Sequence, residues 1–330
     1  MTEKLYQMPH TLNPILSVVV PLYNEAAGLN VFHKSLLTVI TKTVGDNYEI
    51  VYCDDGSTDD TNKIVRAIAK SSPRVELISF SRNFGKESAL AAGIAEANGQ
   101  AILMIDGDGQ HPVSLIPEFL SAWRSGSQVV VGVRTNNLNE GWFKRVGSKN
   151  FYRLFNRLSQ QDLVPGSSDF RLIDREVQKA FLELHESDRM TRALIDWLGF
   201  ERNFIEYQAN ARMHGIAGYN RRKLIQLATN SFVSLTSVPL YLFGYLGILI
   251  TGVSLVSGLT IFVEQLLLND PLGWKFTGTA MLSILLLFLV GVVLLSQGVL
   301  ALYISHIHSQ SRGRPLYVID DKKSLRSRSE

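Results

Sequence analysis

The chain has a single cysteine, Cys53, among its 330 residues. One thiol cannot form an internal disulfide, so the fold must be stable without such a cross-link, and the count agrees with a reducing compartment. Because Cys53 follows an apolar segment, we expect it to lie in the core.

Neither sign of charge dominates, since 33 Lys and Arg stand against 30 Asp and Glu, giving a net charge of +3. This small excess, without a long basic stripe interleaved with aromatic residues, argues against a nucleic-acid-binding protein. Residues 1–16 are polar and lack the apolar centre of a signal peptide, so we expect no cleaved targeting segment. The chain also lacks internal repeats and low-complexity linkers.

Charged residues are almost absent from two long runs, residues 237–263 and 276–304. Each run exceeds the roughly 20 apolar residues that cross a bilayer. We therefore expect two transmembrane helices within residues 236–305, after a soluble domain. Glycines in the first run would allow copies of the chain to pack closely as a homo-oligomer; they are Gly244, Gly247, Gly252 and Gly258.

Basic residues flank the two runs, whereas the turn between them carries Glu264 and Asp270 against Lys275. By the positive-inside bias, the soluble domain and both termini are expected to be cytoplasmic. The flanking basic residues are Arg212, Arg221, Arg222 and Lys223 before the runs, and Arg312, Arg314, Lys322, Lys323, Arg326 and Arg328 after them.

Short apolar segments recur through the first part of the chain and alternate with helical patterns. This alternation predicts an α/β fold, with a mostly parallel sheet covered on both faces. The segments are residues 17–21, 48–52, 75–80, 101–105 and 128–132, and the helical patterns are residues 27–43, 60–71 and 87–98.

Polar clusters follow four of these segments directly. They begin at Tyr23, Asp54, Ser81 and Asp106. Since parallel strands end at one edge of a sheet, and ligands of such sheets bind there, we expect these clusters to form one site.

Asp106-Gly-Asp108-Gly-Gln110 is the strongest local signal. Two carboxylates at this spacing, with glycines that permit a tight turn, suit Mg²⁺ or Mn²⁺ that also takes diphosphate oxygens. Such a metal would neutralise a leaving diphosphate. An isolated Asp-x-Asp is more often a plain acidic surface turn, so the remaining motifs decide between the two readings.

Pro21-Leu-Tyr-Asn-Glu25 and Asp54-Asp55-Gly-Ser-Thr-Asp59, together with Asp106 and Asp108, resemble family 2 glycosyltransferases of the GT-A (Rossmann-like) fold. The resemblance covers residues 17–223. It implies that Pro21, Tyr23, Glu25 and Asp54 or Asp55 hold the donor nucleoside, and that Asp106 and Asp108 bind the metal diphosphate. Residues 57–59 are also good helix N-caps, a role compatible with binding.

A closer resemblance rests on Ser81-Arg-Asn-Phe-Gly-Lys86, Asp106-Gly-Asp-Gly-Gln-His-Pro112, Gly166-Ser-Ser-Asp-Phe-Arg171 and the paired apolar runs. These motifs are similar to polyisoprenyl-phosphate glycosyltransferases. That group includes dolichyl-phosphate mannose synthases, aminoarabinose transferases and, nearest in layout, bactoprenol glucosyltransferases of the GtrB type. Many members have Asp-Ala-Asp-Leu-Gln where this chain has glycine at 107 and 109, a minor departure.

The resemblance implies an enzyme of the bacterial inner membrane that moves a hexose from a nucleotide sugar to undecaprenyl or another polyisoprenyl phosphate. One in-line displacement would invert the anomeric centre. It also implies that Gln110 completes the metal site and that Lys86 and Arg212 help to bind the donor. His214, beside Arg212, is as consistent with an ordinary surface histidine.

The acceptor phosphate is expected near Arg134, Lys144, Arg145 and Ser148, whose positions resemble the lipid-phosphate site of dolichyl-phosphate mannose synthases. Arginine and lysine suit phosphate by forked and point-charge contacts respectively. Arg134 follows a strand and should point into the crevice. Lys144 and Arg145 could instead contact headgroups, because residues 142–158, like 221–235, form a basic amphipathic stretch of the interfacial kind.

Asp169 is expected at the reaction centre, as a base, as a positioning group or, alternatively, in a structural salt bridge. A phosphate monoester has a second pKa of about 6, so near neutral pH the nucleophile is already largely ionised and needs little general-base help. The residues therefore leave the role of Asp169 open.

The sequence does not select the sugar, because a few hydrogen bonds in a pocket of several loops determine it. UDP-glucose is favoured by overall resemblance, ahead of GDP-mannose and UDP-amino sugars. A processive polysaccharide synthase is less favoured, since no Gln-x-x-Arg-Trp element occurs. A nucleotide-sensing membrane protein without activity is a further alternative, although neither run contains a charged pathway.

The expected domain layout follows from these features. It is an extension (1–16), a catalytic domain (17–220) that includes the amphipathic stretch 142–158, a juxtamembrane helix (221–235), the two spans (236–305) and a basic tail (306–330).

Overall fold

The computed structural model describes residues 14–135, 164, 166–184, 186, 189–209 and 278–326, with a few positions between 245 and 256. The chain forms two compact units. The first comprises Met1–Ala217 together with Arg314–Glu330, and the second comprises Gly218–Gly313.

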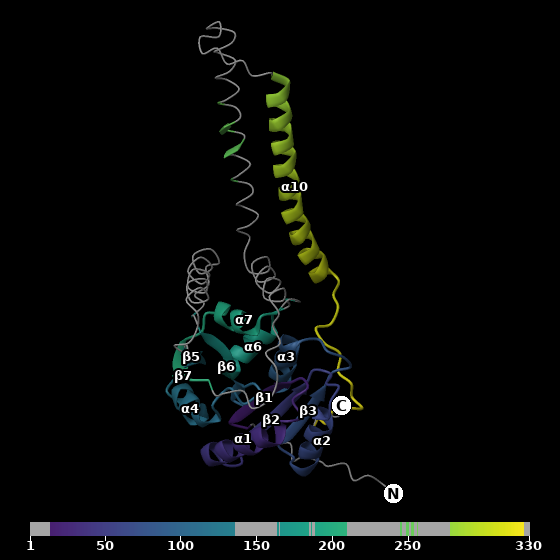
Figure 1. Cartoon of the computed structure of the whole chain (residues 1–330). Helices are drawn as coiled ribbons and strands as arrows, with labels where there is room; N and C mark the ends of the chain where they lie inside the picture. Colours follow the sequence, from purple (N-terminus) through teal and green to yellow (C-terminus); the bar gives the residue numbers. More distant parts are fainter. Residues whose placement is uncertain are drawn as a thin grey trace. The chain divides into compact units, whose positions relative to one another are not determined.

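A seven-stranded sheet in the order β3-β2-β1-β4-β6-β5-β7 forms the centre of the first unit (Figure 1). Only β6 runs antiparallel to its neighbours in this sheet, so the sheet is mixed. The strands are β1 (Leu16–Leu22), β2 (Tyr48–Asp54), β3 (Val75–Ser79), β4 (Ala101–Met104), β5 (Val129–Arg134), β6 (Ser167–Asp174) and β7 (Arg202–Tyr207).

Helices cover both faces of the sheet. The face that presents Val18 and Val20 of β1 packs against α1, α2 and α4, whereas Val19 faces the core under α3, α6 and α7. Burial on both sides explains why β1 is apolar without alternation. The helices are α1 (Leu29–Val44), α2 (Thr61–Ser71), α3 (Lys86–Glu96), the 3₁₀ turn η1 (Val113–Leu115), α4 (Ile116–Arg124), α6 (Arg175–Leu182) and α7 (Thr191–Trp197).

The predicted α/β architecture is confirmed. Each of the five predicted strands coincides with β1 to β5 and the three predicted helices with α1 to α3, within two residues at most ends. Cys53 is fully buried, as expected. The structure adds β6 and β7, which the sequence did not predict, and the amphipathic stretches 142–158 and 221–235 lie outside the described residues.

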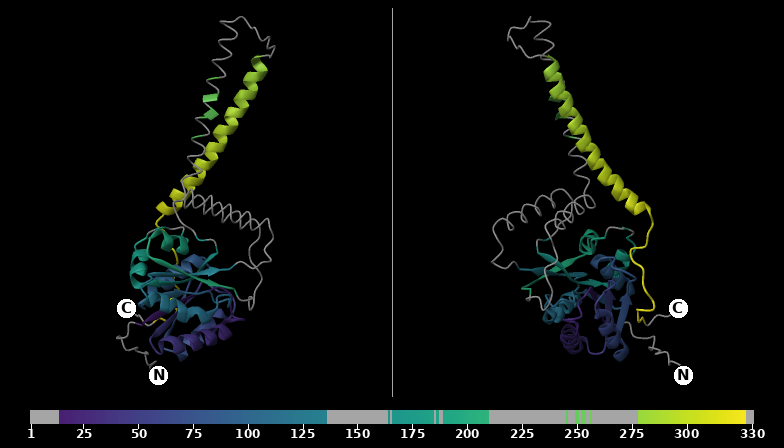
Figure 2. Two further views of the ribbon diagram at one scale, coloured as in Figure 1. Left: turned by 90° about the vertical axis from the view of Figure 1, so that its left-hand side faces the viewer. Right: turned by 45° about the vertical axis from the view of Figure 1, so that its right-hand side comes forward.

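The segment after Gly313 returns to the first unit. Antiparallel bridges join Leu325 to Leu77 and Ile319 to Phe80, so the segment covers the edge strand β3. Figure 2 shows this yellow segment alongside the domain. The sequence-based layout treats residues 306–330 as a basic tail, whereas residues 314–326 are part of the compact unit that holds the sheet.

The second unit contains α10 (Gly278–Ser311), a helix of 34 residues. Its window Phe288–Ser305 has a mean hydropathy of 2.1 and is the one stretch within the described residues that is long and apolar enough to cross a membrane. This helix coincides with the predicted run 276–304. The other run, 237–263, lies almost wholly outside the described residues.

Candidate active site

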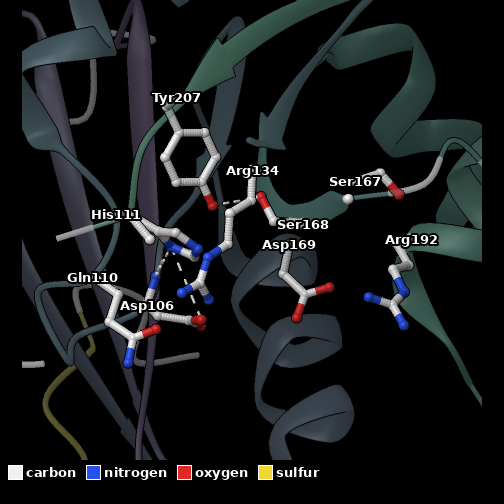
Figure 3. Close-up of a pocket in the computed structure, with 11 residues that line it drawn as sticks. Asp106, Gln110, His111, Arg134, Ser167, Ser168, Asp169, Arg192 and Tyr207 are labelled. Atoms are coloured by element: carbon white, nitrogen blue, oxygen red, sulfur yellow. Dashed lines mark hydrogen bonds and ion pairs between the residues drawn. The ribbon is translucent and has the colours of Figure 1, made fainter. Parts of the chain in front are cut away.

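A cavity of about 300 Å³ opens at the edge of the sheet where β4, β5 and β7 end and the antiparallel β6 begins (Figure 3). The reversed direction of β6 brings its first residues to the edge that receives the ends of the parallel strands. The wall is made by Asp106, Gln110, His111, Arg134, Gly166, Ser167, Ser168, Asp169, Arg192, Tyr207 and Ala209.

One ammonium group joins two carboxylates at this cavity. Nζ of Lys86 lies 2.6 Å from Oδ1 of Asp106 and 2.7 Å from Oδ2 of Asp169. The three side chains come from the first turn of α3, the end of β4 and the start of β6, so the contact ties three separate elements together.

Lys86 and Asp169 each stabilise the charged form of the other. Desolvation opposes the charged form of Lys86, but attraction by Asp106 and Asp169 more than offsets it and raises the lysine pKa. Burial alone would raise the pKa of Asp169, yet the Lys86 ammonium and, more weakly, Arg192 and Arg171 hold that pKa below its usual value. Asp169 is therefore an ionised carboxylate at neutral pH and a weak base.

His111 lines the cavity and contacts the backbone of Asp106. Its Nδ1 accepts a hydrogen bond from the Asp106 backbone N–H at 3.2 Å, and its ring stacks on Phe170 with centroids 5.1 Å apart. Burial lowers the pKa of His111, so the ring is neutral near pH 7 and can keep Nδ1 as an acceptor. The ring thereby fixes the backbone that presents Asp106.

The carboxylate of Asp54 is turned inward, and the residue is 1% exposed. Oδ1 accepts from the Ser57 N–H at 3.0 Å, while Oδ2 accepts from Nδ2 of Asn62 and Oγ of Ser79, each at 3.0 Å. Three donors satisfy the buried charge and fix the turn between β2 and α2.

Asp55 performs the same task for the turn of residues 81–86. Its carboxylate accepts from the backbone N–H of Phe84 at 2.6 Å and from that of Gly85 at 2.9 Å. Burial raises the pKa of Asp55, and these two hydrogen bonds oppose that rise. Because α3 begins at Lys86, Asp55 helps to set the position of the lysine.

Arg171 does not contact Asp169 by a hydrogen bond or ion pair among the described contacts. Its guanidinium, 1% exposed, makes hydrogen bonds of 2.8 and 3.2 Å to the carboxylate of Asp196. The pair anchors α7 to β6, and α7 carries Arg192 to the wall opposite Arg134.

The structure brings Asp106, Gln110, Arg134 and Asp169 of the sequence-predicted site to one cavity, with Lys86 bonded across its edge. Other predicted residues lie around the same edge without lining the cavity: Pro21, Tyr23, Glu25, Asp54, Asp55 and Asp108. Arg212, Lys144, Arg145 and Ser148 lie outside the described residues, as does His214.

Seven cavity residues were not among the predicted site residues: His111, Gly166, Ser167, Ser168, Arg192, Tyr207 and Ala209. His111 and residues 166–168 belong to motifs quoted in the sequence analysis and could have been selected on that ground. Arg192 and Tyr207 come from α7 and β7, which carry no polar motif, so only the fold reveals them.

The sequence model of glycosyl transferase family 2 matches residues 17–182, about half of the chain. A bactoprenol glucosyl transferase of Shigella phage SfV is 35% identical over 308 residues, which cover 93% of this chain and 99% of that protein. The chain belongs to glycosyl transferase family 2.

This family 2 glycosyltransferase is also 32% identical to the prophage bactoprenol glucosyl transferase homolog of Escherichia coli K12, over 92% of this chain and 98% of that one. A glucosyl-3-phosphoglycerate synthase from Mycobacterium tuberculosis, solved with Mn²⁺ and UDP-glucose, covers 67% of this chain at 22% identity with a TM-score of 0.46. That structural likeness is too weak to bear on the chemistry. The mixed sheet and the family membership together give the enzyme a GT-A-like α/β fold.

Proposed function

We propose that this family 2 glycosyltransferase transfers glucose from UDP-glucose to the phosphate of undecaprenyl phosphate or a related polyisoprenyl phosphate. A phosphate oxygen of the lipid attacks the anomeric carbon while the bond from that carbon to the nucleoside diphosphate breaks on the opposite face. The products are a glucosyl phospholipid with inverted configuration and UDP. The observation that carries the proposal is the similarity, over 92–93% of this chain, to bactoprenol glucosyl transferases, whose names state this class of acceptor.

The donor end of the site suits a divalent metal. Asp106, Asp108 and Gln110 offer only oxygen ligands within one turn, as Mg²⁺ and Mn²⁺ prefer. A bound metal would neutralise charge on the leaving diphosphate. The remaining predicted donor contacts, from Pro21, Tyr23, Glu25 and Arg212, belong to the same proposal.

The acceptor end suits a phosphate. Arg134 and Arg192 lie on facing walls of the cavity, with the carboxylate of Asp169 between them. Two guanidinium groups can hold a phosphate dianion next to the sugar, and positioning two anions is the main task of the catalyst because the nucleophile is already ionised. We assign Asp169 to positioning, since its lowered pKa makes it a poor base. Lys144, Arg145 and Ser148 extend this acceptor site in the proposal.

The lipid acceptor requires a membrane enzyme. Apolar side chains of α10 such as Leu282, Phe288 and Ile307 are 55–64% exposed. Exposed apolar surface on this scale is stable against lipid or another apolar partner. With the other apolar run, residues 237–263, this favours two transmembrane helices and association between copies of the chain. The positive-inside bias favours a cytoplasmic catalytic domain.

The decisive experiment supplies labelled UDP-glucose, GDP-mannose or UDP-N-acetylglucosamine to the purified protein with undecaprenyl phosphate and Mg²⁺ or Mn²⁺. We expect label in organic-extractable lipid from UDP-glucose, loss of that label with EDTA, and at least a ~10²-fold loss in Asp108→Asn, because the metal site is broken. Asp46→Asn is the matched control, since Asp46 is 75% exposed and forms only a surface ion pair with Arg74.

Label from another donor would change the sugar and keep the reaction. Absence of lipid label from every donor, with the wild-type protein folded, would overturn the proposed reaction.

A further inference from the structure

We propose that, in the segment of residues 316–319, the Tyr317 ring and the backbone carbonyls of Leu316 and Val318 form a positioning element of the active site. This element holds the turn of residues 81–86 and the start of α3 and, through them, Lys86. This inference rests on the function proposed above, because it assigns the segment a role in that reaction.

Hydrogen bonds join the segment to the chain at both ends of the turn. Before the turn, the Val318 carbonyl accepts a hydrogen bond from the Ser81 N–H at 2.9 Å. After the turn, the Leu316 carbonyl shares the hydroxyl hydrogen of Ser88 with the Phe84 carbonyl, and each oxygen lies 3.3 Å from Oγ. The carbonyls of Leu316 and Val318 therefore accept hydrogen bonds from the two ends of the turn, which lies more than 220 residues earlier in the chain.

Aromatic contacts add to these hydrogen bonds. The Tyr317 ring lies nearly parallel to that of Phe80, with centroids 4.9 Å apart and an interplanar angle of 10°. Phe80 is fully buried and meets Phe84 of the turn edge-on, with centroids 5.8 Å apart. Offset stacked and edge-to-face pairs are each favourable by about 0.5–1.5 kcal/mol beyond burial. Tyr317 thus supports the turn through two successive ring contacts.

The opposite side of the turn is held by Asp55, which accepts the N–H groups of Phe84 and Gly85. Gly85 has φ +102°, a conformation that glycine adopts freely and side-chain-bearing residues rarely adopt, so the glycine allows the chain to turn into α3. The next residue is Lys86. The segment and Asp55 therefore fix the backbone from which the lysine reaches Asp106 and Asp169.

Small displacements at this lysine matter, because catalytic groups held within about half an ångström of their productive geometry account for much of a rate enhancement. Without the segment, β3 would also be an uncovered sheet edge, and its backbone groups would lose their partners. The active site is thus completed by residues that follow α10 in the chain.

The test is a double-mutant cycle in the full-length protein, measuring kcat/KM for sugar transfer to lipid. Tyr317→Ala is expected to lower kcat/KM about tenfold, since Lys86 is displaced. Tyr317→Phe, which keeps the ring, should retain activity. Val318→Ala is the matched control, because that side chain is 46% exposed while its backbone carbonyl is kept.

The double mutant shows whether Tyr317 affects activity through Lys86. In a Lys86→Met background, Tyr317→Ala should cause little further loss, because the two changes act through one group. If the losses multiply instead, or if Tyr317→Ala is as active as Val318→Ala, the inference is wrong. Tyr317→Leu serves in the same cycle if the alanine variant does not fold.

Hydrogen exchange gives a readout independent of turnover. Amides of residues 80–88 should exchange faster in Tyr317→Ala than in Val318→Ala, because the turn opens locally. Unchanged exchange overturns the inference even if the enzyme is active. Absence of transfer by the wild type, with the exchange difference present, overturns the proposed function and leaves the contact between the segment and the turn intact.

Discussion

At the scale of single residues, the electrostatics of the site depend on a few charged side chains in contact. Lys86 lies between Asp106 and Asp169, and this contact keeps both the lysine and Asp169 ionised. The folded-state pKa of Asp169 is depressed, so its ion pair stabilises the folded state above the unfolded pKa of Asp, about 3.9, and is lost as pH falls through the folded value. Near neutral pH neither Lys86 nor Asp169 titrates.

Asp169→Asn tests the assignment of this residue to positioning. We expect kcat/KM to fall roughly 10–100-fold while the pH profile between pH 5 and 8 keeps its shape, because the inflection belongs to the lipid phosphate with a second pKa of about 6. The measurement is kcat/KM against pH for the variant and the wild type. Disappearance of the acidic limb in the variant would instead identify Asp169 as the base.

Sequence motifs predicted these residues by type but not by orientation. Asp106 and Asp169 were found because each belongs to a local motif. That Asp54 and Asp55 are 1% and 3% exposed, and use their carboxylates to hold turns, could not be predicted. Which side of a turn a carboxylate faces depends on donors such as Asn62 and Gly85, which lie 8 and 30 residues away.

At the scale of elements, the site depends on two turns in direct contact. A Cβ added to Gly56 would lie 2.5 Å from the backbone carbonyl carbon of Arg82, and Gly56 has φ +67°. The turn after β2 therefore packs against the turn after β3, backbone against backbone, and neither can shift without the other.

Gly56→Ala should disrupt this contact. Backbone strain and the clash together are expected to lower the free energy of unfolding by about 2–4 kcal/mol and to weaken binding of UDP-glucose. Gly45→Ala separates the two causes, since Gly45 has φ +62° but nothing within 4 Å of its added Cβ; it should cost only about 1 kcal/mol. Thermal unfolding and calorimetric titration measure both effects. Equal losses in the two variants would show that the packing of the turns contributes nothing.

Elements with local signals were predictable, and those defined by distant pairing were not. The buried runs of β1 to β5 and their polar ends follow from local hydrophobicity. β6 inserts between β4 and β5 in the opposite direction, an arrangement that its own residues do not reveal because it is fixed by partners such as Met104 and Val131. Residues 319–325 cover β3 through contacts between residues that lie more than 230 positions apart in the chain. No local sequence pattern can predict such contacts.

At the scale of the whole molecule, orientation across the membrane is testable through the scarcity of cysteine. Cys53 is fully buried, and burial raises the pKa of its thiol, so it should not react with maleimides. The exposed side chain of Lys322, and Asn269 in the sequence between the two apolar runs, then provide single reactive positions.

A membrane-impermeant maleimide should label Asn269→Cys in intact spheroplasts and Lys322→Cys only after permeabilisation, as the charge bias around the apolar runs requires. Gel shift of the purified variants measures the labelling, with the wild type as the blank. Labelling of Lys322→Cys in intact spheroplasts would reverse the predicted orientation.

The return of residues 314–326 to the sheet also sets an order of events during synthesis. The strands of the catalytic domain leave the ribosome first, and Gly218–Gly313 must be made before the chain reaches Arg314. At about 5–20 residues per second this interval is on the order of ten seconds. Throughout it, the edge of β3 lacks its last partner and Lys86 lacks its support. On the inference above, Lys86 is fully supported only after residues 316–319 have been translated, so unfinished chains should transfer sugar more slowly than complete ones.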